Sequence, residues 1–464
     1  MKDSSRKEEL KWYEKKRGIN QTQKKRQQEY KVQASIKQQN KIKEELYKKE
    51  EEERRTRRSL EAKKHRTQNL KAECINSLFE VSSVPQDAAK ILNDFDSIIS
   101  SNHPLNSKQR AELPKDIREL SHYLTDERGE RRLGYMNQTS TLSAYIHYYL
   151  WWNLVRLTRL FANLPSSFFN LSDESICLDI GSGPLTVPIA LYMARPELRS
   201  KKLTWYCMDL SKEALSIGEN LLLSVSARLQ GESWKIVRVK GELGTSINQK
   251  ADLITCANVF NEIVQDNSMP PDYLAKKYSE KILSYINTRN ERRAVLIIEP
   301  GVPQSSRFVS LMRDALIRKS YSILSPCPHM AECPMDGKKG GKWCNYAFST
   351  EDAPAALKKL SESARLPKER AVLSFTAAVF DGSKDNEEKE TDRDKAPSAL
   401  KFRIASDPIR LPGQRTGYYA CSQKGLLLVI TDHNLYSGQC YRIREPRYQM
   451  NTDAKSGALI LNLE

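Results

Sequence analysis

The stretch Ser175-Ile-Cys-Leu-Asp-Ile-Gly-Ser-Gly183 decides the fold of this chain. It begins as a short apolar strand that carries an acid, Asp179, near its tip. Gly181 and Gly183 then turn the backbone into an apolar helix, predicted over 187–193. A strand, a glycine turn and a helix in this order open a doubly wound α/β sheet, because glycine lets the backbone turn tightly and pass close to a ligand.

Alternating strands and helices continue along the central region. After the first strand, apolar strands are predicted at 203–209, 234–239, 252–256 and 294–299. Parallel strands that helices cover on both faces read as short apolar runs of this kind. We therefore predict a parallel, doubly wound sheet with a ligand site at the carboxyl ends of its strands.

An acid at the end of the second strand, Asp209, is placed to accept hydrogen bonds from ribose hydroxyls. A dinucleotide-binding enzyme would carry Gly-x-Gly-x-x-Gly with the acid about twenty residues on. Here the acid follows Asp179 by about thirty residues. The pattern instead resembles the S-adenosylmethionine-binding fold of class I methyltransferases. The predicted cofactor-binding residues are Asp179, Gly181, Gly183, Asp209 and Asn258.

The segment after the fourth strand reads Cys256-Ala-Asn-Val-Phe-Asn-Glu262. Amino-group methyltransferases carry Asn or Asp beside Pro-Pro-aromatic at this point, to hold the target nitrogen. This chain lacks that motif, so the resemblance assigns no catalytic residue. Cys256 as a nucleophile toward a pyrimidine carbon would have to be a thiolate, and no Pro-Cys pair or second cysteine accompanies it. Asn261 and Glu262 either line the pocket or cap the following helix.

Four cysteines of the C-terminal half stand apart from the others: Cys327, Cys333, Cys344 and Cys421. The first three lie in a polar loop rich in proline and glycine, which can wrap around an ion, and thiolates in such a loop suit a metal or cluster site. Four thiolates also satisfy tetrahedral zinc. The cysteines of the central strands stand in apolar runs instead and read as small buried side chains: Cys177, Cys207 and Cys256.

Length and composition bound the class of protein. At 464 residues the chain is long enough for two or three domains. It has no apolar run of about twenty residues, so no membrane-spanning helix is expected. Nine cysteines without a secretory signal indicate a reducing compartment. The net charge of +17 points to a polyanionic partner, most often nucleic acid.

The basic charge is concentrated at the start of the chain. Residues 1–70 hold 23 lysines and arginines against 12 acidic residues, which leaves +11 of the net +17 in this segment. Its composition favours helix but offers no apolar seam for a coiled coil. The segment is either a solvated tail, partly helical or disordered, or an arm that becomes ordered along RNA phosphates.

The other domain boundaries follow the changes in sequence pattern. We predict a helical domain over 71–170, a methyltransferase-like domain over 171–390 with a cysteine loop at 325–346, and a small β-rich module over 391–464. Aromatic residues of 142–164 recur at helical spacing and read as core rather than as a platform for bases. The polar stretch 118–129 is predicted to be a turn or exposed loop.

Several motifs occur in order along about residues 110–440 and are matched together: Leu120-Ser-His-Tyr-Leu-Thr-Asp-Glu-Arg-Gly, Ala144-Tyr-Ile-His-Tyr-Tyr-Leu-Trp-Trp-Asn, Leu178-Asp-Ile-Gly-Ser-Gly-Pro, Val259-Phe-Asn-Glu-Ile, Ile298-Glu-Pro-Gly, Cys327-Pro-His-Met-Ala-Glu-Cys-Pro and Trp343-Cys. Together they resemble the methyltransferase-like small-ribosomal-subunit assembly-factor family, which comprises the mitochondrial ribosome factor and its bacterial relatives. The cysteine-proline motif is the most specific part of the resemblance.

The resemblance implies a methyltransferase-like fold, association with the small ribosomal subunit and its rRNA, and a four-iron four-sulfur cluster. It places the cluster ligands at Cys327, Cys333, Cys344 and Cys421. The chain also departs from the family. Leu185 follows the Gly-Ser-Gly-Pro turn where the family often has glycine, and it could crowd the methionine end of the cofactor pocket. Asn345 follows the third cysteine where histidine is common.

Two classes of function remain open. The first is a ribosome-assembly factor, in which S-adenosylmethionine and the cluster are structural or sensing elements. The alternative is an active S-adenosylmethionine-dependent rRNA methyltransferase, and the missing target-nitrogen motif favours the first. We expect a monomer without membrane association, cytoplasmic in a bacterium and in the mitochondrial matrix of a eukaryote.

Overall fold

The computed structural model separates the chain into two compact units, Met1–Asn69 and Leu70–Glu464. It describes residues 70–125, 134–263, 269–338, 342–382, 399–444 and 450–464, and before residue 70 the stretch 43–55 with scattered residues between 18 and 41. Residues 43–55 are helical with exposed side chains. Most of the basic arm predicted at 1–70 lies outside the described residues, and the boundaries predicted within the second unit stay predictions.

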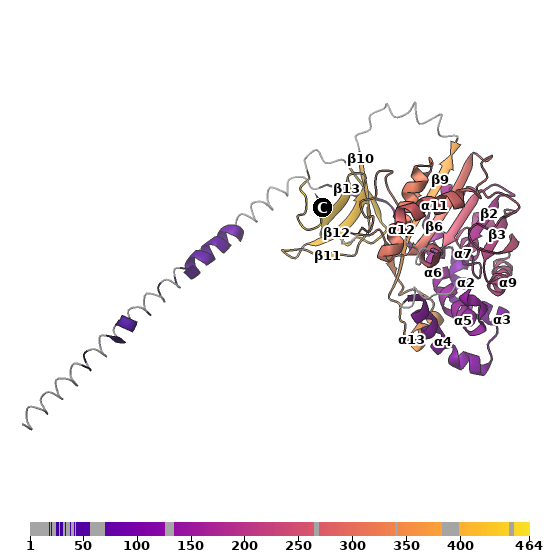
Figure 1. The fold of residues 1–464 in the computed structure, drawn as a ribbon, viewed down its shortest axis with the longest axis horizontal. Helices are drawn as coiled ribbons and strands as arrows, with labels where there is room; N and C mark the ends of the chain where they lie inside the picture. The colour runs from indigo at the N-terminus through magenta and orange to yellow at the C-terminus, as the bar shows by residue number, and fades with distance from the viewer. Residues whose placement is uncertain are drawn as a thin grey trace, which may run out of the picture. The chain divides into compact units, whose positions relative to one another are not determined.

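An eight-stranded sheet forms the centre of the second unit (Figure 1). Its strands are β2 (Ile176–Ile180), β3 (Thr204–Asp209), β4 (Lys235–Lys240), β5 (Leu253–Ala257), β6 (Arg292–Pro300), β7 (Ser322–Ser325), β8 (Tyr346–Ser349) and β9 (Arg370–Asp381). The order is β4-β3-β2-β5-β6-β9-β7, with β8 paired to β9. Strands β2 to β6 are parallel, and β9 runs antiparallel to its neighbours. The predicted doubly wound sheet is confirmed, and the fold is class I methyltransferase-like.

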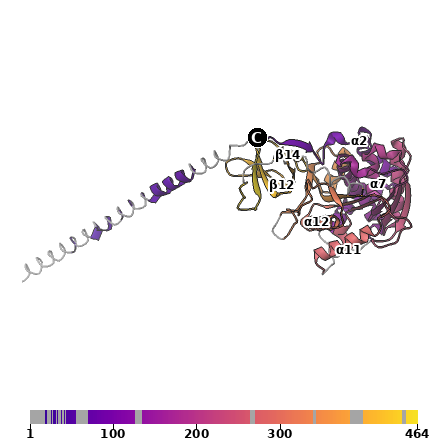
Figure 2. The same cartoon turned by 90° about the horizontal axis from the view of Figure 1, so that it is seen from above.

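Helices cover both faces of this sheet, because alternate residues of its strands enter two different hydrophobic clusters. Cys177 and Trp205 belong to one cluster, while their neighbours Leu178 and Tyr206 belong to the other. The helices of the central region are α7 (Thr186–Ala194), α8 (Pro196–Arg199), α9 (Lys212–Arg228), α10 (Phe260–Ile263), α11 (Pro271–Leu283), α12 (Pro303–Ile317) and α13 (Ala355–Ser363). In Figure 2, α11 and α12 lie towards the bottom of the view and α2 towards its top.

The helical segment packs against the first of these clusters. Its elements are η1 (Val81–Ser83), α2 (Gln86–Asn93), α3 (Phe95–Asn102), α4 (Ser107–Thr125), η3 (Tyr135–Asn137), α5 (Thr139–Ala144), η4 (Tyr145–Leu150), α6 (Trp151–Asn163) and η5 (Ser166–Phe169). The aromatic stretch 142–164 is largely core, as its spacing predicted. The loop predicted at 118–129 is wrong over 118–125, which form the end of α4. Ile117 and Leu120 are buried there, one turn apart.

A second, seven-stranded sheet stands at the end of the chain. It contains β1 (Glu73–Asn76), β10 (Ala399–Ile404), β11 (Ile409–Arg410), β12 (Thr416–Ser422), β13 (Gly425–Thr431), β14 (Cys440–Arg444) and β15 (Leu459–Asn462). It has a core of its own around Phe402 and Tyr418. Its edge strand β1 comes from the segment where we expected the helical domain to begin, and pairs with β14.

No helix within the described parts of the chain has both the length and the apolar character needed to cross a membrane.

The glycine turn after β2 rests on α9 at Gly218. A Cβ at this position would lie 2.4 Å from the carbonyl carbon of Pro184 and 2.8 Å from Cδ1 of Leu185. Leu185 is fully buried here and is not among the residues that line the ligand cavity described below. Contrary to the expectation from the sequence, it therefore does not crowd that cavity.

We expect Gly218→Ala to lower the free energy of unfolding by about 1–3 kcal/mol, because overpacking forces backbone shifts. Chemical denaturation measures this loss. The matched control is Asn220→Ala, an exposed position on the same helix, which should change stability little. Equal stability of the two variants would show that α9 does not support the turn.

Candidate functional site

A cavity of about 510 Å³ opens at the carboxyl ends of the central strands. This is where the strand order reverses, since β2 lies between β3 on one side and β5 on the other. Open α/β sheets bind their ligands at such a point. Four of the five predicted cofactor-binding residues line the cavity: Gly181, Gly183, Asp209 and Asn258. The fifth, Asp179, does not line it.

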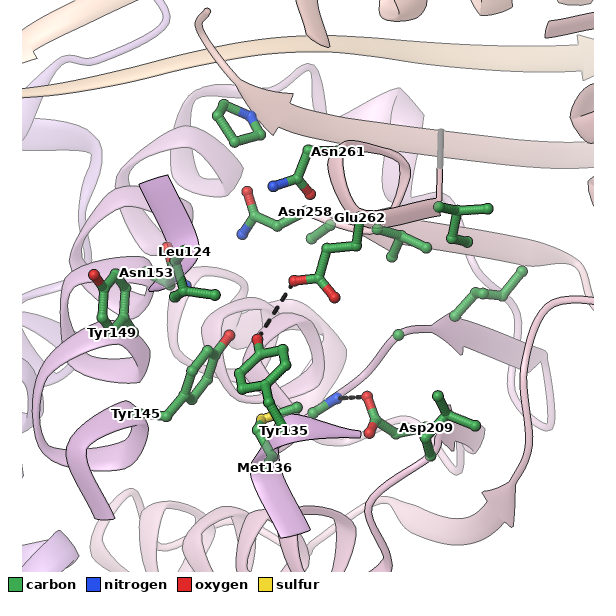
Figure 3. A pocket seen from close by; sticks show the side chains of 18 of the residues that line it. Leu124, Tyr135, Met136, Tyr145, Tyr149, Asn153, Asp209, Asn258, Asn261 and Glu262 are labelled. Carbon is green, nitrogen blue, oxygen red and sulfur yellow. Dashed lines mark hydrogen bonds between the residues drawn. The ribbon is translucent and has the colours of Figure 1, made fainter. Parts of the chain in front are cut away.

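Asp209 connects the glycine turn to the start of α9. Its carboxylate accepts the backbone N–H groups of Gly183 and Ser211, each at 2.9 Å, and Figure 3 shows the side chain at the edge of the cavity. Burial raises the pKa of Asp209, and the backbone N–H groups that it accepts lower it. A carboxylate offers about four acceptor positions, so Asp209 keeps acceptors for a hydroxyl of a ligand.

Asp179 does not line the cavity and instead holds the turn through a hydrogen bond with Ser182. It is buried and accepts hydrogen bonds from the hydroxyls of Ser182 at 2.6 Å and Thr255 at 2.5 Å. Burial raises its pKa to about 7, against the lowering effect of the two hydroxyls. The structure therefore places Asp179 where it positions the turn rather than where it touches a ligand.

The turn requires glycine at position 181. Gly181 has a φ of 67°, and a Cβ there would lie 2.5 Å from the Val259 side chain. Gly183 also has a positive φ, of 51°. The two glycines therefore bring bare backbone to the cavity wall.

Asn258 also has a left-handed backbone, with a φ of 58°. Its side-chain oxygen accepts a hydrogen bond from Nη2 of Arg156 at 3.2 Å. Arg156 belongs to α6. It holds Asn258, the predicted cofactor-binding residue that follows β5.

Glu299 is a residue that our sequence prediction missed. It is fully buried, and its carboxylate accepts the backbone N–H groups of Val259, Phe260 and Asn261 at 2.8–3.0 Å. Burial raises its pKa to about 8, while these N–H groups lower it. Glu299 therefore caps α10. Asn261 and Glu262, the candidates for that role from the sequence, line the cavity instead. In the sequence, Glu299 could be recognised only as an acid at the end of an apolar strand.

Tyr145, Tyr149 and Asn153 of the helical segment line the cavity on the side away from Asp209 (Figure 3). Two basic side chains also line it, Arg156 from α6 and Lys368 from the loop before β9. The rings of Tyr145 and Tyr149 are stacked with centroids 5.8 Å apart.

Tyr135 and Glu262 face each other across the cavity, with the tyrosine hydroxyl 3.4 Å from a carboxylate oxygen of Glu262.

Cys256 is buried in the core and is not among the residues that line the cavity. Burial raises its pKa well above the ordinary value. Neither observation suits a thiolate nucleophile.

The four candidate metal ligands influence one another electrostatically. Burial is the main reason why the pKa of Cys421 in β12 is raised, and the nearby thiols of Cys327, Cys344 and Cys333 raise it further. Nε2 of His329, from the cysteine loop, lies 3.0 Å from Sγ of Cys421. By contrast, the groups that shift the pKa of Cys440 do not include these loop cysteines.

Arg313 of α12 holds the cysteine loop, and the sequence prediction missed it. The side chain is buried, and its Nε donates to Sγ of Cys327 at 3.2 Å. Its Nη2 donates to the carbonyls of His329 at 3.0 Å and Ala331 at 2.8 Å. Burial raises the pKa of Cys327, and the contacting guanidinium of Arg313 lowers it and so favours the thiolate form. The only sign of this role in the sequence is that an arginine stands on the apolar face of a helix.

Within the described ranges, no three or more His, Cys, Asp and Glu side chains are arranged to hold a single metal ion.

Comparison with solved structures finds methyltransferases at low identity. A precorrin-6y C5,15-methyltransferase from Geobacter metallireducens is 12% identical with a TM-score of 0.27, over 46% of this chain and 84% of that one. A SAM-dependent methyltransferase from Geobacter sulfurreducens, in complex with S-adenosyl-L-homocysteine, is 11% identical with a TM-score of 0.27, over 49% and 89%. None of the curated proteins compared with the chain matches it.

The family comparison is decisive. The model of the Rsm22 family, described as mitochondrial small ribosomal subunit Rsm22, matches residues 141–397. The match covers more than half of the 464 residues and includes the central sheet and the cysteine loop. With its methyltransferase-like sheet, this chain belongs to the Rsm22 family.

Proposed function

We propose that this chain is an assembly factor of the small ribosomal subunit that binds rRNA on an S-adenosylmethionine-binding scaffold with an iron-sulfur cluster. The observation that carries the proposal is the family, whose description names the mitochondrial small ribosomal subunit. The net charge of +17 supports a polyanionic partner. We further propose a monomer, located in the mitochondrial matrix of a eukaryote or in the cytoplasm of a bacterium.

The cavity supports S-adenosylmethionine as the ligand. Asp209 keeps carboxylate acceptors at the end of β3 for the ribose hydroxyls. Gly181 and Gly183 let the ligand approach the backbone, and Asn258 closes the site beyond β5. We propose these four as cofactor contacts and Asp179 as the residue that positions the turn.

The cysteine site supports a four-iron four-sulfur cluster held by Cys327, Cys333, Cys344 and Cys421. Four cysteine thiolates are the ligand set of such a cluster. The buried guanidinium of Arg313 fits this proposal because it balances thiolate charge. A bound cluster would tie the cysteine loop to β12, and so join the two sheets. Zinc, the alternative, needs four sulfurs about 2.3 Å from one point.

Methyl transfer to rRNA is the second candidate function. It is favoured by the lining of the cavity, in which Arg156 and Lys368 accompany the four proposed cofactor contacts. The sequence after β5 lacks the Pro-Pro-aromatic motif of amino-group methyltransferases, which is why we rank this function second.

Binding to small-subunit rRNA is expected to weaken as salt rises, by at least about tenfold between 50 and 200 mM, because phosphate contacts release counterions. Filter binding with purified rRNA measures the dependence. Deletion of residues 1–69, the first compact unit, should make the slope shallower, since these residues carry +11 of the net charge. An affinity that salt does not change would contradict the electrostatic part of the proposal.

A further inference from the structure

Beyond the four proposed cofactor contacts, the cavity is lined by side chains of the helical segment and of the loop before β9. Neighbouring strands lie about 4.8 Å apart, so the three steps from β3 to β6 separate Asp209, at the end of β3, from Pro300, at the end of β6, by about 14 Å. We name the end away from Asp209 the far half, formed by Tyr145, Tyr149, Asn153, Arg156 and Lys368. Figure 3 shows Tyr145, Tyr149 and Asn153 on this side.

Arg156 makes hydrogen bonds only with neutral groups in the described part of the chain. Nη1 donates to the carbonyl of Val372 at 3.3 Å, and Nη2 donates to the side-chain oxygens of Asn153 at 3.0 Å and Asn258 at 3.2 Å. Its Nε is buried without a hydrogen-bond partner. The guanidinium is therefore held in place, but none of these bonds neutralises its charge.

Lys368 stands beside it in a cage of aromatic rings. Its Nζ lies 5.1 Å from the ring centre of Tyr148, 5.6 Å from that of Tyr149 and 5.4 Å from that of Trp152. Among the residues that the structure describes, no acid forms an ion pair with Lys368. Burial lowers its pKa to about 7, and the nearby Arg156 lowers it further.

Two neighbouring cations in one cavity repel each other, and an anion between them offsets that repulsion. Burial lowers the pKa of Arg156, whereas Glu299 raises it electrostatically. The Glu299 carboxylate, however, accepts three backbone N–H groups and is held at the start of α10. Glu262 lies towards Tyr135. The far half therefore has a positive charge that a ligand can neutralise.

We propose that the far half binds a nucleotide of the RNA partner, with its phosphate between Arg156 and Lys368 and its base against the stacked Tyr145 and Tyr149. Arginine and lysine are the side chains that bind phosphate, and an aromatic face accepts any base. The inference rests on the proposed function and deepens it, because it assigns a substrate class to the same cavity.

Calorimetry on the full chain, saturated with S-adenosylhomocysteine, tests the proposal with cytidine 5′-monophosphate and cytidine as probes. The monophosphate should bind at least about tenfold more tightly than the nucleoside, since charge-assisted hydrogen bonds form only with the phosphate. Arg156→Gln and Lys368→Met should each abolish this difference. Lys368→Met keeps the aromatic cage filled, and Lys368→Arg should retain the preference. The matched control is Lys359→Gln, an exposed lysine of α13.

Equal affinity of the wild type for the two probes overturns the proposal. So does a loss of S-adenosylhomocysteine affinity in Arg156→Gln with an unchanged preference for monophosphate, because the anion would then be the carboxylate of the cofactor. If the wild type fails to bind S-adenosylhomocysteine but still prefers the monophosphate, the anion site stands and the proposed cofactor is wrong.

Discussion

Replacing Asp209 by alanine is expected to weaken S-adenosylmethionine binding by about 1–3 kcal/mol, or about five- to 150-fold in the dissociation constant. Two losses contribute. The ribose hydroxyls would lose their acceptor, and the backbone N–H groups of Gly183 and Ser211 would lose the carboxylate that holds them. Calorimetry on the intact, metal-loaded protein measures the change.

A control for Asp209→Ala is Asp432→Ala, which removes an exposed carboxylate from the C-terminal sheet region. It should bind the cofactor as the wild type does. Asp209→Asn separates the two losses, because the amide keeps one acceptor oxygen but cannot satisfy both N–H groups and a hydroxyl. Undiminished binding by Asp209→Ala, or no binding by the intact wild type, would remove the cofactor assignment.

Replacing Cys333 by serine is expected to abolish iron and sulfide binding, to remove the brown colour that the proposed cluster would give, and to destabilise the C-terminal half of the chain. The loss of stability should exceed the about 1–3 kcal/mol of one buried hydrogen-bonding group, because the binding energy of a structural metal site is folding energy. Iron and sulfide analysis after purification without oxygen, followed by denaturation, measures both effects.

The matched control for Cys333→Ser is Cys440→Ser, since Cys440 is a buried cysteine of the same half of the chain whereas Cys333 is half-buried. It introduces the same hydroxyl but should retain the iron. Iron that persists in Cys333→Ser would show that the ligand set is wrong. One zinc per chain without sulfide, in the wild type, would establish the alternative metal.

The sequence predicts the central sheet well because the signal there is local. Strands β2, β3 and β6 are largely apolar runs that end near a glycine or an acid, and the predicted strand at 175–180 appears as β2 (Ile176–Ile180). The glycine turn is also local in its backbone, since Gly181 and Gly183 both have a positive φ, although the side chain that excludes a Cβ at position 181 is that of the distant Val259.

The parts that the sequence did not predict depend on contacts between distant segments. Strand β1 is too short and too exposed to be recognised alone, and it exists because β14 pairs with it. The helix at 118–125 has few apolar residues, and Leu120 becomes core only through tertiary packing.

The sequence did not predict the charged residues of the two sites, for the same reason. Arg156 bonds Asn258 and Val372, and Arg313 bonds the loop at 327–331, so each arginine finds its partners far along the chain. Lys368 stands in a loop, and only the fold surrounds it with the rings of Tyr148, Tyr149 and Trp152.

Sedimentation of extract from the source cells tests most directly whether this Rsm22-family chain acts on the small ribosomal subunit. The protein should be found by antibody in the fractions that hold immature small subunits at low salt, and should leave them when salt is raised, as counterion release requires. Its presence in the free fractions alone, at every salt concentration, would contradict an assembly role.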